Sequence, residues 1–223
     1  IHFPQRLFHL PLILTHIGHS EKVFIVKRLL LILILTLSFQ SWTNADEISD
    51  FEIEGMSMGD NLLDHLDTIG VTKNEILKKE LFYYPKSKKF AGIAFSDRGF
   101  FKTYSLVQFT INPDTYIIED LSGVIDITNQ KDCEKKQKKI FSEISEIFKS
   151  GKKTEDAFRP HAFDKTGNSI ANGLYIETET GDQISVECYI WGKEIQKEKN
   201  WGDNLKVNIS SKKVIYFLNN EAY

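Results

Sequence analysis

An arginine, a histidine and an aspartate lie close together in the polar stretch 152–170. They are Arg159, His161 and Asp164. A guanidinium beside a neutral imidazole can bind an anion, and an imidazole beside a carboxylate can act as a general base. No G-x-S-x-G, C-x-x-C or H-E-x-x-H motif accompanies them. His161 and Asp164 are therefore catalytic candidates without a supporting motif, and Arg159 is a candidate for ligand binding.

Aromatic residues form a second candidate site. Residues 183–191 alternate in side-chain character, which predicts a half-buried strand. Cys188 faces the core in this pattern, whereas Tyr189 and Trp191 lie on the opposite face, and Trp201 follows soon after. If a helix covers that face, the aromatic residues belong to a second layer of core. If none does, they form a platform for a sugar, a peptide or a partner protein.

The two cysteines predict a disulfide bond. Cys133 lies on the apolar stripe of a helix predicted over residues 131–149, and Cys188 faces the core in the predicted strand. They are about 55 positions apart, whereas redox-active pairs are usually close in sequence. A bridge that closes a loop of this length contributes roughly 4 kcal/mol. Two buried free thiols, or a redox or metal-binding pair, are the alternatives.

The hydrophobic pattern predicts an α+β fold. Most strands are joined by turns of hairpin length, and the helices lie in separate blocks. We expect a single domain, with an antiparallel sheet of about five to seven strands packed by the amphipathic helix 131–149 and by shorter helices. Residues 51–54 are predicted to form a short strand, and the stretch 152–170 is predicted to be irregular.

Capping patterns predict where the short helices begin. Thr72 and Glu75 have the spacing of a capping box, in which each side chain bonds the backbone of the other residue. Ser57 and Asp60 predict a similar start for a nearby helix. Ser211 is predicted to cap the last helix of the chain.

The composition is that of an ordinary globular protein and excludes several classes. Of the 223 residues, 26% are charged and 41% are hydrophobic, and the formal net charge is -3. Such a chain is not collagenous, disordered or a multi-span membrane protein. It also lacks the concentrated basic surface of nucleic-acid-binding modules. Beyond the first 45 residues the only histidines are His65 and His161, so we expect no metal site and no cofactor.

Residues 26–45 have the layout of a secretory signal peptide. Lys27 and Arg28 precede an uncharged run of 11 residues, which is too short to span a bilayer. Cleavage after Ala45 leaves residues 46–223 as a single exported domain. We therefore expect a periplasmic or secreted protein that meets the membrane only transiently, through the signal peptide. An uncleaved anchor is the alternative.

Residues 1–25 differ in composition from the remainder of the chain. Four of the six histidines lie there, and the apolar residues show no sustained period. The chain also begins with Ile1. Our hypothesis is that residues 1–25 are translated upstream sequence and that Val26 marks a non-ATG start codon.

Several blocks of the sequence resemble a family of small exported proteins. The blocks are Lys27-Arg28-Leu29-Leu30-Leu31, Phe51-Glu52-Ile53-Glu54-Gly55-Met56-Ser57-Met58-Gly59-Asp60-Asn61-Leu62-Leu63, Tyr84-Pro85-Lys86-Ser87-Lys88-Lys89, Asp132-Cys133, Phe163-Asp164-Lys165-Thr166-Gly167, Ile184-Ser185-Val186-Glu187-Cys188 and Ala222-Tyr223. From Val26 onward the chain is similar to uncharacterised proteins of marine alphaproteobacteria of the Pelagibacter group. The resemblance implies export and a shared fold, but no assigned activity.

These patterns predict a non-enzymatic binding or interaction module. Its partner is an unknown ligand or an envelope protein, and not a nucleic acid. The site combines the aromatic residues with the loop at 152–170. A hydrolase-type enzyme that uses His161 with Asp164 is one alternative, and a purely structural envelope protein is another. An exposed aromatic face favours binding, whereas a pocket lined by His161 favours chemistry.

Overall fold

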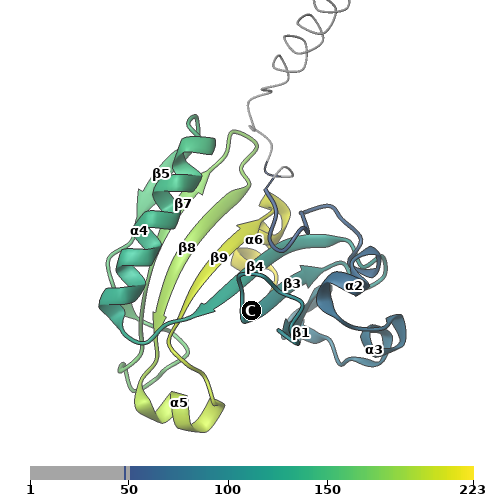
Figure 1. The fold of residues 1–223 in the computed structure, drawn as a ribbon, viewed down its shortest axis with the longest axis horizontal. Coiled ribbons are helices and arrows are strands. Elements are labelled where there is room, and N and C mark those ends of the chain that lie inside the picture. Colours follow the sequence, from purple (N-terminus) through teal and green to yellow (C-terminus); the bar gives the residue numbers. More distant parts are fainter. Residues whose placement is uncertain (1–47, 49–50) are drawn as a thin grey trace, which may run out of the picture. The chain divides into compact units, whose positions relative to one another are not determined.

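The computed structural model describes Ile48 and residues 51–223 (Figure 1). The signal peptide predicted at residues 26–45 and the segment 1–25 lie outside the described residues. Within the described part of the chain, no helix combines the length and the apolar character needed to cross a membrane.

The sheet formed by the described residues is antiparallel throughout and has nine strands. Its spatial order is β1-β2-β3-β4-β9-β8-β7-β5, and β6 pairs with β7. The strands are β1 (Phe82–Tyr84), β2 (Ser87–Ser96), β3 (Leu106–Ile111), β4 (Ile118–Asp126), β5 (Lys152–Glu155), β6 (Arg159–Pro160), β7 (Ile170–Glu177), β8 (Gln183–Ile190) and β9 (Asn204–Ser210). Helices pack against this sheet, so the predicted α+β class is confirmed.

The number of strands exceeds the predicted five to seven. The additional strands are short: β1 is one, and β5 and β6 lie in the stretch that the sequence predicts to be irregular. All residues of β5 are exposed, so they show no alternation of apolar and polar side chains. The pairing of β5 with β7 is a tertiary interaction, which local sequence does not encode.

Residues 51–61 form neither the strand nor the helix start that their sequence predicts. Ile53 and Met56 make only an isolated bridge. Gly55 and Gly59 have φ angles of 75° and 89°. These left-handed conformations interrupt both a strand and a helix. Helical turns begin further on, with η2 (Leu62–Asp64) and α2 (Leu66–Ile69).

The other two capping predictions are confirmed. The side chains of Thr72 and Glu75 form the predicted capping box at the start of α3 (Lys73–Lys78). The Ser211 hydroxyl accepts the N–H of Val214 at 3.2 Å, at the start of α6 (Lys212–Asn220). Each cap satisfies backbone N–H groups that a helix end leaves without an intrahelical partner.

One face of the sheet packs against α4 (Gln130–Ile147), the helix predicted over residues 131–149 (Figure 1). Ile144 and Phe148 are buried in this core. The predicted disulfide is also confirmed, since Cys133 of α4 is bonded to Cys188 of β8 with their Cα atoms 6.0 Å apart. The bridge therefore links the helix to an interior strand of the sheet.

The opposite face of the sheet is only partly covered. Val214 and Phe217 of α6 pack with Phe90 of β2 in a small second core. The Phe217 ring meets the rings of Phe90 and Tyr84 edge-on, with centroids 5.0 and 5.1 Å apart. The part of this face that α6 leaves uncovered lines two pockets.

Candidate functional site

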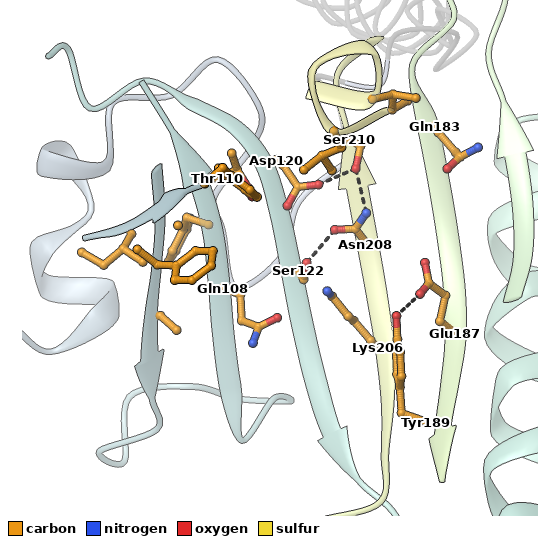
Figure 2. A pocket seen from close by; sticks show the side chains of 18 of the residues that line it. Gln108, Thr110, Asp120, Ser122, Gln183, Glu187, Tyr189, Lys206, Asn208 and Ser210 are labelled. Atoms are coloured by element: carbon orange, nitrogen blue, oxygen red, sulfur yellow. Dashed lines mark hydrogen bonds between the residues drawn. The ribbon is translucent and has the colours of Figure 1, made fainter. Parts of the chain in front are cut away.

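Two rows of polar side chains cross four neighbouring strands on the open face of the sheet. In the order β3, β4, β9 and β8, the first row consists of Gln108, Ser122, Asn208 and Ser185. The second row consists of Thr110, Asp120, Ser210 and Gln183 (Figure 2). The rows arise because every second residue of a strand faces the same side. The intervening residues, such as Leu121 and Val207, are buried on the α4 side.

Most of these side chains line two adjoining pockets of about 780 and 580 Å³. Gln108, Tyr189 and Lys206 line both pockets, so we treat the two as one continuous groove. The larger pocket is bordered by α6, through residues such as Leu218. The smaller pocket is bordered by aromatic side chains, including Trp201. The groove therefore has a polar floor between a helix and an aromatic end.

A chain of hydrogen bonds orders part of the floor. The Ser122 hydroxyl donates to Asn208 Oδ1 at 2.5 Å, and Asn208 Nδ2 donates to Ser210 Oγ at 2.8 Å. Ser210 in turn donates to Asp120 Oδ2 (Figure 2). Burial raises the pKa of Asp120, and the positive charge of Lys206 opposes that shift. The carboxylate is thus held in place by a neighbour from another strand.

Glu187 is the second carboxylate of the floor. It accepts the Ser185 hydroxyl at Oε1 (2.6 Å) and the Tyr189 hydroxyl at Oε2. Burial, followed by the adjacent charge of Glu187, raises the pKa of Tyr189 well above its usual value. The phenol therefore stays protonated at neutral pH. In the strand register Lys206 lies directly opposite Glu187.

Some half-buried polar side chains of the groove floor form no hydrogen bond or ion pair with another described residue. They include Gln108, Gln183 and Lys206. Figure 2 shows them on the same face as the bonded chain. The two amides offer both donors and acceptors, and the ammonium group offers donors only. These groups are available to a ligand that enters the groove.

The aromatic residues singled out in the sequence lie together at one end of the groove. The rings of Tyr189 and Trp191 are stacked, with centroids 5.7 Å apart and planes 12° apart. The ring centroid of Trp201 lies 4.8 Å from that of Trp191, and the ring centroid of Phe163 lies 5.1 Å from that of Trp201. Trp201 and Phe163 are 40% and 47% exposed. With His161, these residues form the aromatic cluster, whose outer rings are a surface and not a second layer of core.

The indole N–H of Trp191 is an unusual feature of the cluster. This group is buried and has no hydrogen-bond partner among the described residues. An unpaired buried donor costs about 1–3 kcal/mol. Trp191 also lines the smaller pocket, but the N–H itself is buried and does not face the space open to a ligand.

His161 packs against two rings of the aromatic cluster. Its ring centroid lies 5.6 Å from that of Tyr189 and 4.8 Å from that of Trp191. Its Nδ1 accepts the N–H of Phe163 at 3.2 Å, so the neutral ring carries its proton on Nε2. Burial lowers the pKa of His161, and Glu187 and then Asp164 oppose the shift. At neutral pH the ring is an uncharged donor.

The Asp164 carboxylate is engaged within its own loop. Its Oδ1 accepts the N–H and O–H of Thr166 at 2.9 and 2.7 Å. Its Oδ2 accepts the N–H and O–H of Ser169 at 2.8 and 2.6 Å. The hydrogen bonds from Ser169 first, and then from Thr166, hold the pKa of Asp164 far below its usual range. The carboxylate thus organises the loop and makes no hydrogen bond with the His161 ring.

Two of the sequence-predicted site residues do not line the groove. Arg159 is exposed and pairs with Asp156 at 3.0 Å. Neither Arg159 nor Asp164 is a lining residue of either pocket. The structure brings together His161, Tyr189, Trp191 and Trp201. Among the residues that the structure describes, no cluster of three or more His, Cys, Asp or Glu side chains is placed to hold a metal.

Replacing Ser169 with alanine is expected to lower the free energy of unfolding by about 1–3 kcal/mol. Ser169 is completely buried, and its hydroxyl also accepts the N–H of Gly192 at 2.9 Å. The substitution leaves this N–H without its acceptor and removes one of the two hydrogen bonds that Asp164 Oδ2 accepts. Urea unfolding at neutral pH measures the loss, and Ser142→Ala on the exposed side of α4 is the control.

The same variant has an expected pH signature. Because the pKa of Asp164 is lower in the folded protein than in the unfolded chain, its stabilising effect is complete above about pH 4. The effect is lost as the pH falls through the folded-state value. Ser169→Ala should weaken this acid dependence. An unchanged urea midpoint at neutral pH together with an unchanged acid dependence would contradict the assigned role.

The floor residues of the groove were not identified from the sequence. Asp120, Glu187, Lys206 and Asn208 all occupy polar positions of alternating strands. The alternation of apolar and polar residues was the signal that the sequence offered for this floor, but the same alternation is equally typical of a sheet face exposed to solvent. The pairing of strands far apart in the chain is what gathers these residues.

Comparison of the chain with protein-family models, with curated proteins and with solved structures finds no match. A fold does not by itself specify a function. The functional interpretation is therefore based on the groove and its side chains.

Proposed function

We propose that the protein is an exported, non-enzymatic module that binds a small ligand in the groove. The main support for this proposal is that a polar floor and a partly exposed aromatic cluster line one continuous groove. On that floor Gln108, Gln183 and Lys206 bond to no other described residue. Ligand sites commonly combine apolar surface with a few polar groups that orient the ligand. The groove has both.

Export is supported by the sequence and by the disulfide. Residues 26–45 have the layout of a signal peptide. The Cys133–Cys188 bridge is typical of proteins in oxidising compartments. The resemblance to small exported proteins of the Pelagibacter group agrees with these two features. These features support our proposal that the protein is periplasmic or secreted.

The use of the polar side chains favours binding without catalysis. A general base must reach the proton that it removes. Both oxygens of Asp164 are engaged by Thr166 and Ser169, and His161 Nδ1 is engaged by a backbone N–H. A hydrolase that uses His161 with Asp164 would need this loop to rearrange. Full turnover by a His161→Ala variant, on any substrate found by screening, would exclude that alternative.

Intrinsic fluorescence offers a direct binding assay. Trp42 lies within the predicted signal peptide, so Trp191 and Trp201 are the two tryptophans of the mature chain. Both belong to the aromatic cluster. We expect a saturable change in emission with at least one member of a panel of neutral sugars, amino acids, dipeptides, nucleosides and polyamines. A protein without such a response to any member would instead fit a structural envelope role.

Replacing Trp201 with alanine is expected to raise the Kd of the bound panel member by at least about tenfold. Trp201 is partly exposed, so the fold should persist, as circular dichroism can verify. Calorimetric titration gives the Kd without relying on fluorescence. The control is Phe100→Ala, because Phe100 is 56% exposed but lies outside the groove. Binding that survives the double change Trp191→Ala and Trp201→Ala would refute this site.

A further inference from the structure

We propose that the ligand of the groove is a neutral carbohydrate. One sugar ring lies against the exposed rings of Trp201 and Phe163, and its hydroxyl groups bond to the side chains of the floor. This inference rests on the proposed binding function and specifies its ligand class. It follows from the charge of the groove, from the pattern of donors and acceptors, from the sheet topology and from the exposed rings.

The charges along the groove argue against an anionic ligand. Four carboxylates and two ammonium groups line it: Glu80, Asp120, Asp126, Glu187, Lys79 and Lys206. None of the described lining residues is an arginine, although the guanidinium fork is the common partner of phosphates and carboxylates. On the floor, Lys206 lies opposite Glu187 and balances its charge. With two positive and four negative groups, the lining has a formal charge of -2 and disfavours an anion, and because Lys206 offsets Glu187 on the floor, a ligand without net charge meets no repulsion there.

The hydrogen-bonding groups of the floor match a ligand rich in hydroxyl groups. A hydroxyl donates one hydrogen bond and accepts up to two. The unpaired amides of Gln108 and Gln183 present a donor and an acceptor side by side, and Lys206 adds a donor between them (Figure 2). Along a strand, side chains of one face repeat at about 6.8 Å, and neighbouring strands lie about 4.8 Å apart. Because β4 and β9 lie between β3 and β8, Gln108 and Gln183 are about 14 Å apart across the sheet, so the floor can bond hydroxyls spread along more than one sugar ring.

The topology of the sheet argues against an extended peptide. Peptides often bind sheets by adding a strand to a free edge, through main-chain hydrogen bonds. The strands of the floor, β3, β4, β9 and β8, each have a neighbour on both sides. Their main-chain groups are therefore already paired within the sheet. Recognition in the groove uses side chains alone, which suits a ligand that carries its own polar groups around a ring.

The exposed rings provide the apolar part of the site. A pyranose ring carries C–H groups on its faces, and these pack well against a flat aromatic ring that remains partly in water. Trp201 and Phe163 are exposed at the end of the groove, with ring centroids 5.1 Å apart.

The test is a titration of the purified mature protein with carbohydrates of defined linkage. The probes are glucose, mannose and N-acetylglucosamine, short neutral oligomers of each, and a galacturonate oligomer as the charged counterpart. Tryptophan emission and calorimetry report binding. We expect saturable binding of at least one neutral probe, tighter binding of its oligomers because the groove extends over two pockets, and weaker binding of the galacturonate oligomer.

Variants assign the bound probe to the groove. Gln108→Ala removes a floor side chain that supports no other described residue, so the fold should persist while the Kd rises about tenfold. The matched control is Gln130→Ala, on the exposed surface of α4 and outside the groove, which should leave the Kd unchanged. If Gln108→Ala and Trp201→Ala both bind the neutral probe with unchanged Kd, the proposal is overturned.

The remaining outcomes separate the ligand class from the binding function. If amino acids, dipeptides, nucleosides or polyamines bind in a Trp201-dependent manner and neutral sugars do not, the carbohydrate assignment fails while the binding function stands. If no probe of any class changes tryptophan emission or releases heat, both fail. Preference for the galacturonate oligomer over neutral oligomers would likewise overturn the assignment, because it would contradict the charge argument.

Discussion

Loss of the Cys133–Cys188 bridge is expected to lower the free energy of unfolding by about 4 kcal/mol and the melting temperature by roughly 10 °C. The bridge closes a loop with a sequence separation of 55 residues. A cross-link of this span removes many conformations from the unfolded chain, which is the main source of the stabilisation. Urea and thermal unfolding of the double variant Cys133→Ala and Cys188→Ala measure the effect. Alanine is chosen because both positions are completely buried.

Reduction of the wild-type protein is the matched control. In the presence of a thiol reductant, the wild type should unfold at a urea concentration close to that of the double variant. The double variant should not respond to the reductant. If reduction leaves the wild-type midpoint unchanged, the bridge does not provide this stabilisation. Cys188 lies between Glu187 and Tyr189 in β8, so the bridge also anchors the strand that supplies three groove residues.

Replacing Phe217 with alanine is expected to cost about 3–5 kcal/mol, the usual range for a fully buried phenylalanine. The side chain has no exposed surface. It is the central ring of the small core beneath α6, where it meets Phe90 and Tyr84. Without it, Val214 and Ala222 are the remaining fully buried apolar contacts of the C-terminal segment. Urea unfolding measures the loss, and limited proteolysis shows whether α6 has detached.

The control for this prediction is the neighbouring residue of the same helix. Tyr216 is 58% exposed, so Tyr216→Ala should change the free energy of unfolding by no more than about 0.5 kcal/mol. Because α6 borders the groove through Leu218, Phe217→Ala should also weaken ligand binding, although Phe217 does not line the groove. Equal urea midpoints for the two variants would show that the small core does not hold the helix.

Local sequence patterns were sufficient to predict several elements of the fold. The apolar stripe predicts a helix over 131–149, and α4 spans Gln130–Ile147. The capping box at Thr72 and the cap at Ser211 form as their spacing predicts. These signals work because a cap or a helical face involves residues within a few positions of one another.

Other elements could not be found in this way. Lys152–Glu155 pairs with β7 although all of its residues are exposed, so no apolar alternation marks it. At residues 51–61, the polar spacing is that of a helix start, but left-handed glycines at positions 55 and 59 prevent one. The Gly59 N–H also bonds the Ile118 carbonyl at 2.8 Å, so in both places contacts with distant parts of the chain accompany or outweigh the local preferences.

The aromatic end of the groove could be predicted from local sequence, whereas its polar floor could not. Tyr189 and Trp191 were identified from their position opposite Cys188, because the alternation of one strand decides which side chains share a face. The floor depends on registers such as Asp120 opposite Ser210, which join residues 90 positions apart. No short-range pattern encodes such a register, since the alternation of each strand is satisfied by any pairing that keeps its apolar face inward. The chain sequence was thus enough for the fold class, the disulfide and the aromatic residues, whereas the groove exists only because long-range pairing aligns four polar strand faces.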